Sequence, residues 1–328
     1  MSDREPNLAG NALRVTLITK QPGDLPPWVA GAAAAAGLAL TARRCETHEE
    51  LLRQAGEADV IWTVGANTCL TADVLPRLPR CRAIMRSGSG LDDLPVAAAR
   101  ARGLLVANTP EAIAETVAEH AVAMLLGLAR RLAEHDRAVR RGEWYSGPDG
   151  ARWHVRGQTL GLVGFGLIAR EVVAMLQGFR MRFLAHDPYA PEADLRAQGA
   201  DPVALETLLR ESDFVSLHCP LTPQTKGLLD ARAFAAMKPG ALLINTSRGG
   251  VVDEAALLEA LQSGRLGGAA LDVLEQEPPR GDHPLLRLEQ VLFTPHIAAF
   301  SDVFEERFWR ASITKLKQLE ARIKETKR

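Results

Sequence analysis

The 328-residue sequence has few cysteines, no excess of charge and no long apolar run. Its four cysteines, at positions 45, 69, 81 and 219, lie far apart and include no Cys-x-x-Cys pair. This spacing argues against both a disulfide framework and a zinc site, and it suits a reducing compartment. We therefore expect neither disulfides nor a bound metal.

The chain also has no excess of charge of either sign, because its 39 Lys and Arg residues nearly balance its 40 Asp and Glu residues. This balance gives no reason to expect a nucleic acid or an anionic membrane as a partner. The longest alanine run, residues 32–36, is far too short to span a bilayer. The N-terminal residues have no apolar core of the kind found in signal peptides. We expect a soluble, globular, cytoplasmic protein with room for two domains.

Strand-like and helix-like segments alternate along the chain, which is typical of parallel α/β sheets. The alternation continues from the N-terminal hundred residues through a long helix that follows Pro110 to an amphipathic helix beyond Ser301. The last helix cannot form a domain by itself, so we expect it to pack on the N-terminal part. The early pattern predicts strands at Leu13–Thr19, Leu38–Arg43, Asp59–Val64, Arg82–Met85 and Leu104–Ala107, and helices near Pro27–Ala36 and Thr47–Ala55.

The most informative segment is a glycine-containing turn at residues 164–169. An apolar strand, Leu160–Val163, leads into Gly164-x-Gly166-x-x-Ala169, which fits the G-x-G-x-x-G/A phosphate-binding pattern. Gly164 permits the tight turn, Gly166 lets a pyrophosphate approach the backbone, and Ala169 allows close helix packing. The N–H groups at the start of the next helix would face the phosphates. The segment predicts a dinucleotide site, with a purely structural strand–turn–helix as the alternative.

An acidic residue follows the next predicted strand, Met181–His186. Asp187 lies 23 residues after Gly164, close to the spacing at which a carboxylate binds the adenosine ribose hydroxyls. Its charge would repel a 2′-phosphate, and the next two residues, Pro188 and Tyr189, include no arginine that could bind one. The expected cofactor is therefore NAD rather than NADP.

Three further strand-like runs end in residues that can do chemistry. They end at Arg248, among the acids of residues 272–277, and at His296. In doubly wound folds ligands lie beyond the carboxyl ends of the strands, and a guanidinium suits a carboxylate ligand. Taken singly, each feature also fits a surface ion pair, a solvated acidic patch or an incidental histidine. The functional interpretation rests on all three opening onto one cofactor cleft.

These segments, in this order, resemble the D-isomer-specific 2-hydroxyacid dehydrogenases, in their phosphoglycerate dehydrogenase-like and C-terminal-binding-protein-like branch. The likeness extends over residues 83–301 and is thinner before them. It includes residues 86–92, which look like the family's substrate-carboxylate loop. The other segments that carry it are the glycine turn with Asp187, His218–Thr222, Asn245–Gly250, Asp272–Pro278 and Thr294–His296.

The resemblance implies a homodimer, and it implies that Arg248, Glu277 and His296 form the catalytic group. It also implies that Asp272 contacts the nicotinamide amide, whereas His218 either lines the cofactor or is structural. The full expected cofactor set is Gly164, Gly166, Leu167, Ile168, Asp187, His218, Pro220, Thr225, Thr246, Ser247, Asp272 and His296. The expected substrate-binding set is Ser87, Gly88, Ser89, Gly90 and Arg248.

Elementary chemistry agrees with these roles. Reduction of a 2-keto acid places a hydride on the carbonyl carbon, and an imidazolium at His296 can then protonate the oxygen. A carboxylate at Glu277 would orient the ring and raise its pKa. Arg248 would polarise the carbonyl and hold the substrate carboxylate. The backbone N–H groups of residues 87–90 would form a second seat for the anion.

The expected fold is α/β with two doubly wound parallel sheets. A Rossmann NAD-binding domain, residues 108–297, is inserted into a discontinuous flavodoxin-like substrate domain formed by residues 1–107 and 298–328.

The particular keto acid stays open at this point. Phosphoglycerate-oxidising members carry an arginine shortly before a Thr-Ala-Asp-Val-like segment, but residues 64–70 contain no Arg or Lys before Thr71. Arg141 or Arg152 from a partner loop is an alternative phosphate ligand. A formate dehydrogenase is disfavoured, because those relatives have Gln where Glu277 stands.

Two other functions are compatible with the fold. The first is an NAD(H)-sensing, corepressor-like interaction protein, because residues 295–301 are close to the same segment of the C-terminal-binding proteins. The second is a degenerate relic that only binds the cofactor. The relic is disfavoured because no expected catalytic residue is missing.

Overall fold

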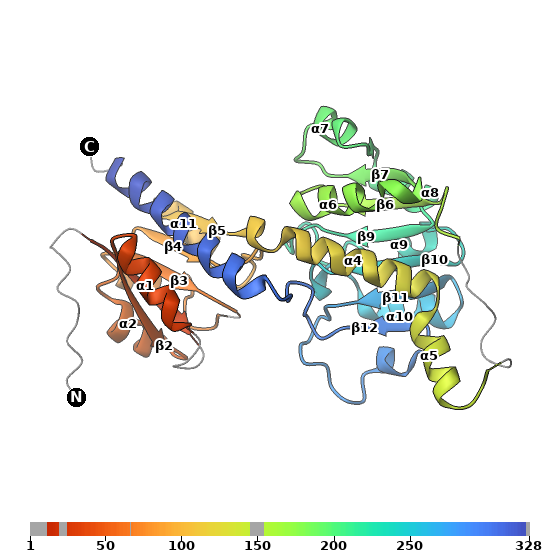
Figure 1. The fold of residues 1–328 in the computed structure, drawn as a ribbon, viewed down its shortest axis with the longest axis horizontal. Helices are drawn as coiled ribbons and strands as arrows, with labels where there is room; N and C mark the ends of the chain where they lie inside the picture. Colours follow the sequence, from red (N-terminus) through yellow and green to blue (C-terminus); the bar gives the residue numbers. More distant parts are fainter. Residues whose placement is uncertain (1–11, 20–24, 66, 145–153, 326–328) are drawn as a thin grey trace. The chain divides into compact units, whose positions relative to one another are not determined.

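The computed structural model describes residues 12–19, 25–65, 67–144 and 154–325 (Figure 1). Arg152, weighed above as a phosphate ligand, lies outside these residues. The chain divides into two compact units, one made of residues 1–113 and 301–328 and the other of residues 114–300. These limits lie slightly C-terminal of the boundaries expected above. Within the described residues, no helix is both long enough and apolar enough to cross a membrane.

The first unit is built on a five-stranded parallel sheet in the order β2-β1-β3-β4-β5. Val15 in the middle of β1 pairs with Leu40 on one side and Val60 on the other. This is the doubly wound order of flavodoxin-like folds, as predicted. The strands are β1 (Leu13–Thr19), β2 (Leu38–Arg44), β3 (Val60–Thr63), β4 (Ala83–Arg86) and β5 (Leu105–Asn108).

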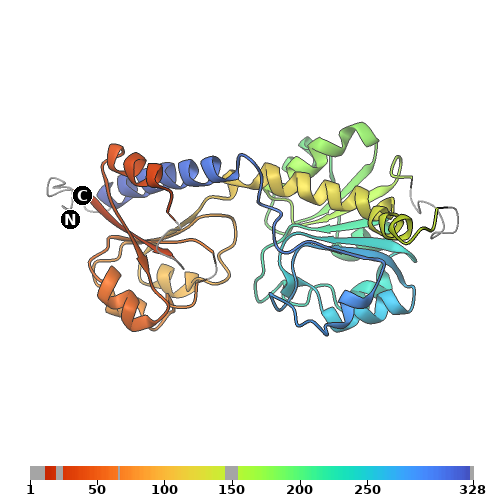
Figure 2. The same ribbon diagram turned by 60° about the horizontal axis from the view of Figure 1, so that its bottom comes forward.

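Helices cover both faces of this sheet, α1 and α11 on one face and α2 and α3 on the other (Figure 2). Successive side chains of β3 point to opposite faces of the sheet and therefore pack into different apolar layers. Ile61 packs with α2 and α3, whereas Trp62 meets Trp309 of α11 edge to face, with 5.5 Å between ring centroids. The helices are α1 (Pro27–Ala35), α2 (His48–Ala55), α3 (Val96–Ala101) and α11 (Phe304–Glu325), with 3-10 turns η1 (Leu75–Arg77) and η2 (Pro110–Ala112).

The second unit contains a seven-stranded sheet in the order β12-β11-β10-β9-β6-β7-β8, and every pairing is parallel. The order reverses between β6 and β9, which is the switch point of a Rossmann fold. The predicted fold class is therefore confirmed. The strands are β6 (Thr159–Val163), β7 (Arg182–His186), β8 (Asp201–Pro202), β9 (Phe214–Leu217), β10 (Ala241–Asn245), β11 (Leu266–Leu271) and β12 (Val291–Phe293).

Two apolar cores sandwich this sheet. Along β10, Leu242 and Ile244 pack under α4 and α6, whereas Leu243 faces α8, α9 and α10. Burial on both faces explains why these strands read as continuous apolar runs. The helices are α4 (Ala114–Ala129), α5 (Leu132–Arg140), α6 (Leu167–Leu176), α7 (Glu192–Ala197), α8 (Leu205–Glu211), α9 (Ala231–Ala236) and α10 (Glu254–Gln262), with 3-10 turns η3 (Gln177–Phe179), η4 (Gly249–Val251) and η5 (Pro284–Arg287).

Because all seven strands are parallel, their carboxyl ends lie at one edge of the sheet. The residues singled out by sequence follow these ends and are therefore ordered along that edge. In strand order they are His296 after β12, Asp272 after β11, Arg248 beyond β10, His218 after β9, Gly164 after β6 and Asp187 after β7.

Candidate active site

The glycine turn has the shape that its sequence predicts. Gly164 has a φ of +87°, and a Cβ there would lie 2.7 Å from the backbone nitrogen of Cys219. Only glycine fits this close approach of two chains. At Gly166, the residue before α6, a Cβ would meet nothing within 4 Å. The space in front of the helix N-terminus is thus open, which suits a pyrophosphate.

Asp187 ties the end of β7 to this turn. Its Oδ2 accepts a hydrogen bond from the amide of Phe165 at 2.8 Å, and its Oδ1 accepts from the amide of Tyr189 at 2.9 Å and of Ala190 at 3.2 Å. A carboxylate has about four acceptor positions. One therefore remains for a ribose hydroxyl, and the neighbouring turn fixes the direction in which the group points.

Two polar atoms near the switch point are buried without a partner in the described part of the chain: Nδ1 of His218 and Oγ1 of Thr246. The other ring nitrogen of His218 lies 2.9 Å from Oγ of Ser216. Burial lowers the pKa of His218 to about 4, so its ring is neutral near pH 7. Buried polar groups are normally satisfied. These atoms, with the open glycine cradle, fit a bound dinucleotide.

Arg248 follows β10 on a loop that is packed against the acidic segment. Asn245, almost fully buried, donates from Nδ2 to the carbonyl oxygen of Arg248 at 3.0 Å. Nη1 of Arg248 donates to the carbonyl oxygen of Ser247 at 2.8 Å. A Cβ on Gly249 would lie 1.9 Å from the carbonyl carbon of Leu274, so glycine is required where the two loops meet.

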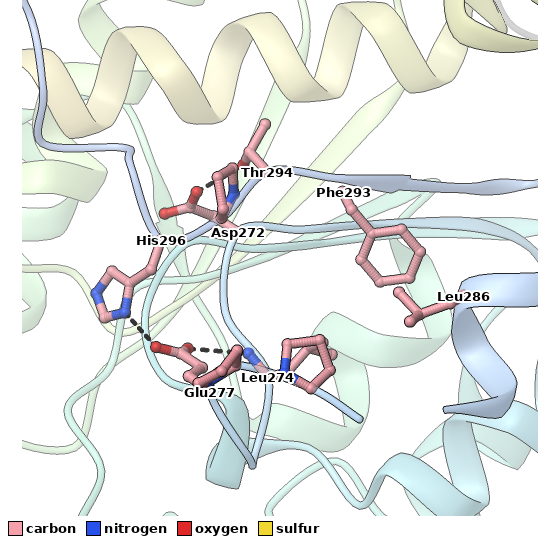
Figure 3. A pocket seen from close by; sticks show the side chains of 10 residues that line it. Asp272, Leu274, Glu277, Leu286, Phe293, Thr294 and His296 are labelled. Carbon is pink, nitrogen blue, oxygen red and sulfur yellow. Dashed lines mark hydrogen bonds and ion pairs between the residues drawn. The ribbon is translucent and has the colours of Figure 1, made fainter. Parts of the chain in front are cut away.

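Glu277 and His296 form a hydrogen-bonded pair. Nδ1 of His296 lies 2.6 Å from Oε2 of Glu277, and Oε1 of Glu277 accepts from the amide of Leu274 at 3.1 Å (Figure 3). The side chains of His296 and Glu277 are 49% and 35% exposed, so a ligand can reach them. The structure thus brings together two residues that lie far apart in the sequence.

This pair shifts both titrations. The hydrogen bond to Glu277 raises the pKa of His296, and the opposing effects of burial and of the Arg248 charge are smaller in sum. Burial alone would raise the pKa of Glu277, but His296, the Leu274 amide and Arg248 together lower it. The site therefore favours an imidazolium beside a carboxylate.

The backbone of His296 is held in an uncommon conformation. Its φ is +54°, and its amide donates to the carbonyl oxygen of Asp272 at 2.8 Å. The buried carboxylate of Asp272 accepts from the amides of Ile297 at 2.9 Å and Ala298 at 3.1 Å. A left-handed non-glycine residue costs on the order of 1 kcal/mol, so it persists only when its surroundings hold it. The hydrogen bonds that Asp272 accepts from the amides of residues 296–298 hold this conformation in place.

The sequence did not single out His120, which reaches this turn from α4. Its Nε2 lies 2.9 Å from Oγ1 of Thr294, and that hydroxyl donates to Oδ1 of Asp272 at 2.5 Å. A hydroxyl has one proton, so His120 must be the donor of the first bond. The only signal in the sequence was a histidine within an otherwise apolar helical stripe.

An apolar pocket of about 350 Å³ adjoins the pair. Figure 3 shows His296 and Glu277 at one end, with Phe293 and Leu286 at the other. Leu274 and three prolines complete the apolar part of the wall. Among the described residues, no group of three or more His, Cys, Asp or Glu side chains is arranged to hold a metal ion.

In the first unit, the expected substrate loop is held more tightly than predicted. The amide of Ser87 donates to the carbonyl oxygen of Thr63 at 3.1 Å, and that of Gly88 to Oγ1 of Thr109 at 2.9 Å. The expectation that these two N–H groups are free to bind an anion is therefore wrong in this structure. Within the described residues, the amides of Ser89 and Gly90 have no such partner.

The side chain of Ser87 is also engaged. Its buried Oγ accepts from Nε1 of Trp62 at 2.7 Å and lies 2.7 Å from Oγ of Ser312. Nδ2 of Asn108 donates to the carbonyl oxygen of Ser89 at 2.8 Å. These contacts make the loop rigid, with Gly88 at a φ of +96°.

Comparison with known proteins gives a consistent result. The NAD-binding domain model of the D-isomer-specific 2-hydroxyacid dehydrogenases matches residues 122–298. The chain is 41% identical to a hydroxypyruvate reductase of Thermotoga maritima, over 76% of this chain and 81% of that protein. It is 38% identical to a D-3-phosphoglycerate dehydrogenase of Archaeoglobus fulgidus, over 80% of this chain but only 50% of that protein.

The chain thus spans about half the length of the phosphoglycerate dehydrogenases that it matches. Among solved structures, it resembles the D-lactate dehydrogenase of Aquifex aeolicus, determined with NAD and lactic acid. The TM-score is 0.80 and the identity 30%, with 92% of this chain and 94% of the other covered.

Proposed function

Because the chain belongs to the D-isomer-specific 2-hydroxyacid dehydrogenase family, we propose that it interconverts a small 2-keto acid and the D-2-hydroxy acid, with NAD as cofactor. The observation that carries the proposal is the 2.6 Å contact between His296 and Glu277. It lies at the same strand edge as Arg248 and the glycine turn.

When bound, NADH would supply the hydride to C2 of the keto acid, and NAD would accept it from C2 of the hydroxy acid. The task of His296 is to move the proton. Because Glu277 occupies Nδ1, Nε2 is the nitrogen that faces the substrate oxygen. In reduction, Nε2 gives its proton to the former carbonyl oxygen, and solvent then reprotonates the ring. In oxidation, neutral Nε2 takes the hydroxyl proton.

Arg248 is proposed to bind the carboxylate of the substrate. A guanidinium offers a planar fork that matches a carboxylate, and its charge also polarises the adjacent carbonyl. The contact of Nη1 with the carbonyl oxygen of Ser247 orients the fork. Within the first unit, the amides of Ser89 and Gly90, which have no partner among the described residues, are candidates to bind an anion.

The remaining cofactor contacts are proposed from the edge order. Gly164, Gly166, Leu167 and Ile168 would face the pyrophosphate and Asp187 the adenosine ribose. On the nicotinamide side of the switch point, the candidates are His218, Pro220, Thr225, Thr246, Ser247 and Asp272.

Asp187 gives a test of cofactor choice. Replacing it with serine removes the charge that repels a 2′-phosphate. We expect kcat/KM for NADH to fall about tenfold, equivalent to about 1.4 kcal/mol, and kcat/KM for NADPH to rise. Steady-state kinetics with both cofactors checks this. An unchanged ratio of the two values would rule out Asp187 as the selecting residue.

Glu277 gives a test of the proton step. The Glu277→Gln variant keeps the side-chain shape but loses the charge that raises the pKa of His296. Reduction needs protonated His296, so activity is lost as pH rises through that pKa. We expect this alkaline decline of kcat/KM to move to lower pH in the variant, by about one pH unit. A pH profile with the wild-type midpoint would contradict the assigned role.

We also propose that the enzyme is a cytoplasmic homodimer. Within the second unit, α5 and the residues after it expose Leu132 by 59%, Val139 by 47% and Trp144 by 70%. Exposed large apolar side chains gathered on one segment are typical of an interface. Light scattering on the purified protein measures its mass directly.

The experiment that tests the activity follows NADH oxidation with glyoxylate, hydroxypyruvate, pyruvate and phosphohydroxypyruvate. Turnover of one of them supports the proposal and names the substrate. Tight NADH binding without turnover of any acid would overturn it and favour the sensing, corepressor-like role.

A further inference from the structure

The loop that carries Glu277 is tied at two points to a single carboxylate that has no part in the proposed chemistry. Oε1 of Glu254 accepts a hydrogen bond from the amide of Glu275 at 2.7 Å. Oε2 of Glu254 lies 3.1 Å from Nε2 of His283. The two tied residues lie on either side of Glu277 in the sequence, so one side chain contacts both ends of the segment 275–283.

The anchor itself is rigid. Glu254 is the first residue of α10, and the preceding Asp253 caps the helix by accepting from the amides of Ala255 and Ala256. Leu257 and Leu261, on the same helix, are buried in the core. The side chains of Glu254 and His283 are only 15% and 21% exposed. A carboxylate at a helix N-terminus is also favoured by the helix dipole.

The tied segment is mostly exposed, and its backbone hydrogen bond from the amide of His283 to the carbonyl oxygen of Arg280, at 3.0 Å, lies within it. Positions 278 and 279 are prolines, which have no N–H to donate. The ion pair between Arg280 and Asp282 is exposed and lies within the segment, so it contributes little. Glu277 itself is bonded to Leu274 at the base of the loop and to His296. Glu254 thus holds the segment from α10 on both sides of Glu277, in addition to the two hydrogen bonds of Glu277 itself.

We propose that Glu254 and His283 form a positioning pair that holds the Glu277-bearing loop so that Glu277 stays hydrogen-bonded to His296. Glu254 acts through the backbone of Glu275 and the ring of His283. It touches neither the proposed substrate nor His296. The expected effect on turnover rests on the proposed function, but the expected effect on the titration of His296 does not.

The first test replaces Glu254 with alanine and measures the titration of His296 by NMR. The charged groups that act on this imidazole are Glu277, Arg248 and Asp272. When both ties are lost, the Glu277 carboxylate spends less time on Nδ1, so the pKa of His296 falls. We expect a fall of about half a pH unit or more. The resonance is assigned by its absence in the His296→Asn variant.

The matched control is Glu259→Ala, which removes an exposed carboxylate from the same helix. We expect it to leave the His296 titration unchanged. A folded Glu254→Ala protein with the wild-type pKa would overturn the proposal. An equal shift in the Glu259→Ala protein would also overturn it, because the effect would then be one of general charge.

A second variant keeps the proposal testable if Glu254→Ala does not fold. Glu254→Gln preserves the shape and can still accept from the amide of Glu275, but it carries no charge for His283. We expect a smaller fall in the pKa of His296, in the same direction. No shift in Glu254→Gln, in that case, would count against the positioning role.

Kinetics adds a readout that simple destabilisation would not give. In Glu254→Ala we expect kcat to fall about tenfold and the alkaline decline of kcat/KM to move to lower pH, with the NADH dissociation constant unchanged. A loss of folded protein would lower kcat/KM by the same factor at every pH, without moving the midpoint of the pH profile. If the wild type reduces no keto acid, the proposed function fails, and the NMR titration still decides the role of Glu254.

Discussion

Replacing His296 with asparagine is expected to lower kcat by about 10²- to 10⁴-fold, the usual value of a positioned general acid. Asparagine is the best matched variant for two reasons. Its amide can still donate to Glu277, as Nδ1 of His296 does at 2.6 Å. It also tolerates the φ of +54° that this position requires. The variant therefore removes the titratable proton and disturbs little else.

The companion measurement is NADH binding. Fluorescence titration should give a dissociation constant within about twofold of the wild type, because the glycine turn and Asp187 lie on the far side of the switch point in the strand order. Loss of both turnover and NADH binding would indicate a folding defect. Turnover within twofold of the wild type would remove His296 from the mechanism.

Replacing Arg248 with lysine is expected to lower kcat/KM for the keto acid by about 10²-fold. Lysine keeps the positive charge but loses the planar fork. It also cannot reproduce the contact with the carbonyl oxygen of Ser247 that orients the group. A charge-assisted hydrogen bond to a buried ligand is worth about 1.5–3 kcal/mol, which corresponds to roughly 10- to 100-fold.

The control for Arg248 is Arg232→Lys, an exposed position on α9. It should leave kcat/KM unchanged. Arg248→Lys should also bind a simple monocarboxylate inhibitor such as oxamate more weakly while binding NADH normally. Wild-type kcat/KM in Arg248→Lys would contradict the proposal that the guanidinium holds the substrate.

Much of the fold follows from the sequence because buried parallel strands leave a clear signal. Leu13–Thr19 is predicted and observed with the same limits. In contrast, β8 was not predicted, since it has two residues and one is a proline. Such a strand forms only because β7 provides a partner edge for it.

The site was predictable where a residue follows a strand directly. Asp187, Asp272 and His296 come at or just after strand ends, and parallel strands bring their ends to one edge. The contact between Glu277 and His296 was expected only from the family resemblance, because the two residues lie 19 positions apart with loop and strand between them. Loop conformation is not readable from the spacing alone.

The remaining parts depend on tertiary packing. His120 reaches Thr294 across 174 residues of sequence, and Glu254 reaches His283 across 29. No local pattern marks either contact. The error at Ser87 and Gly88 has the same origin, because their amides are satisfied by residues of neighbouring strands and loops.

The most direct test of the central claim is product analysis on wild type and His296→Asn side by side. NADH consumption and the chirality of the 2-hydroxy acid formed are measured together for the best keto acid of the panel. We expect one D-2-hydroxy acid per NADH oxidised in the wild type and at least about a hundredfold slower formation in the variant. An L product, or a D product formed equally fast without His296, would contradict this expectation.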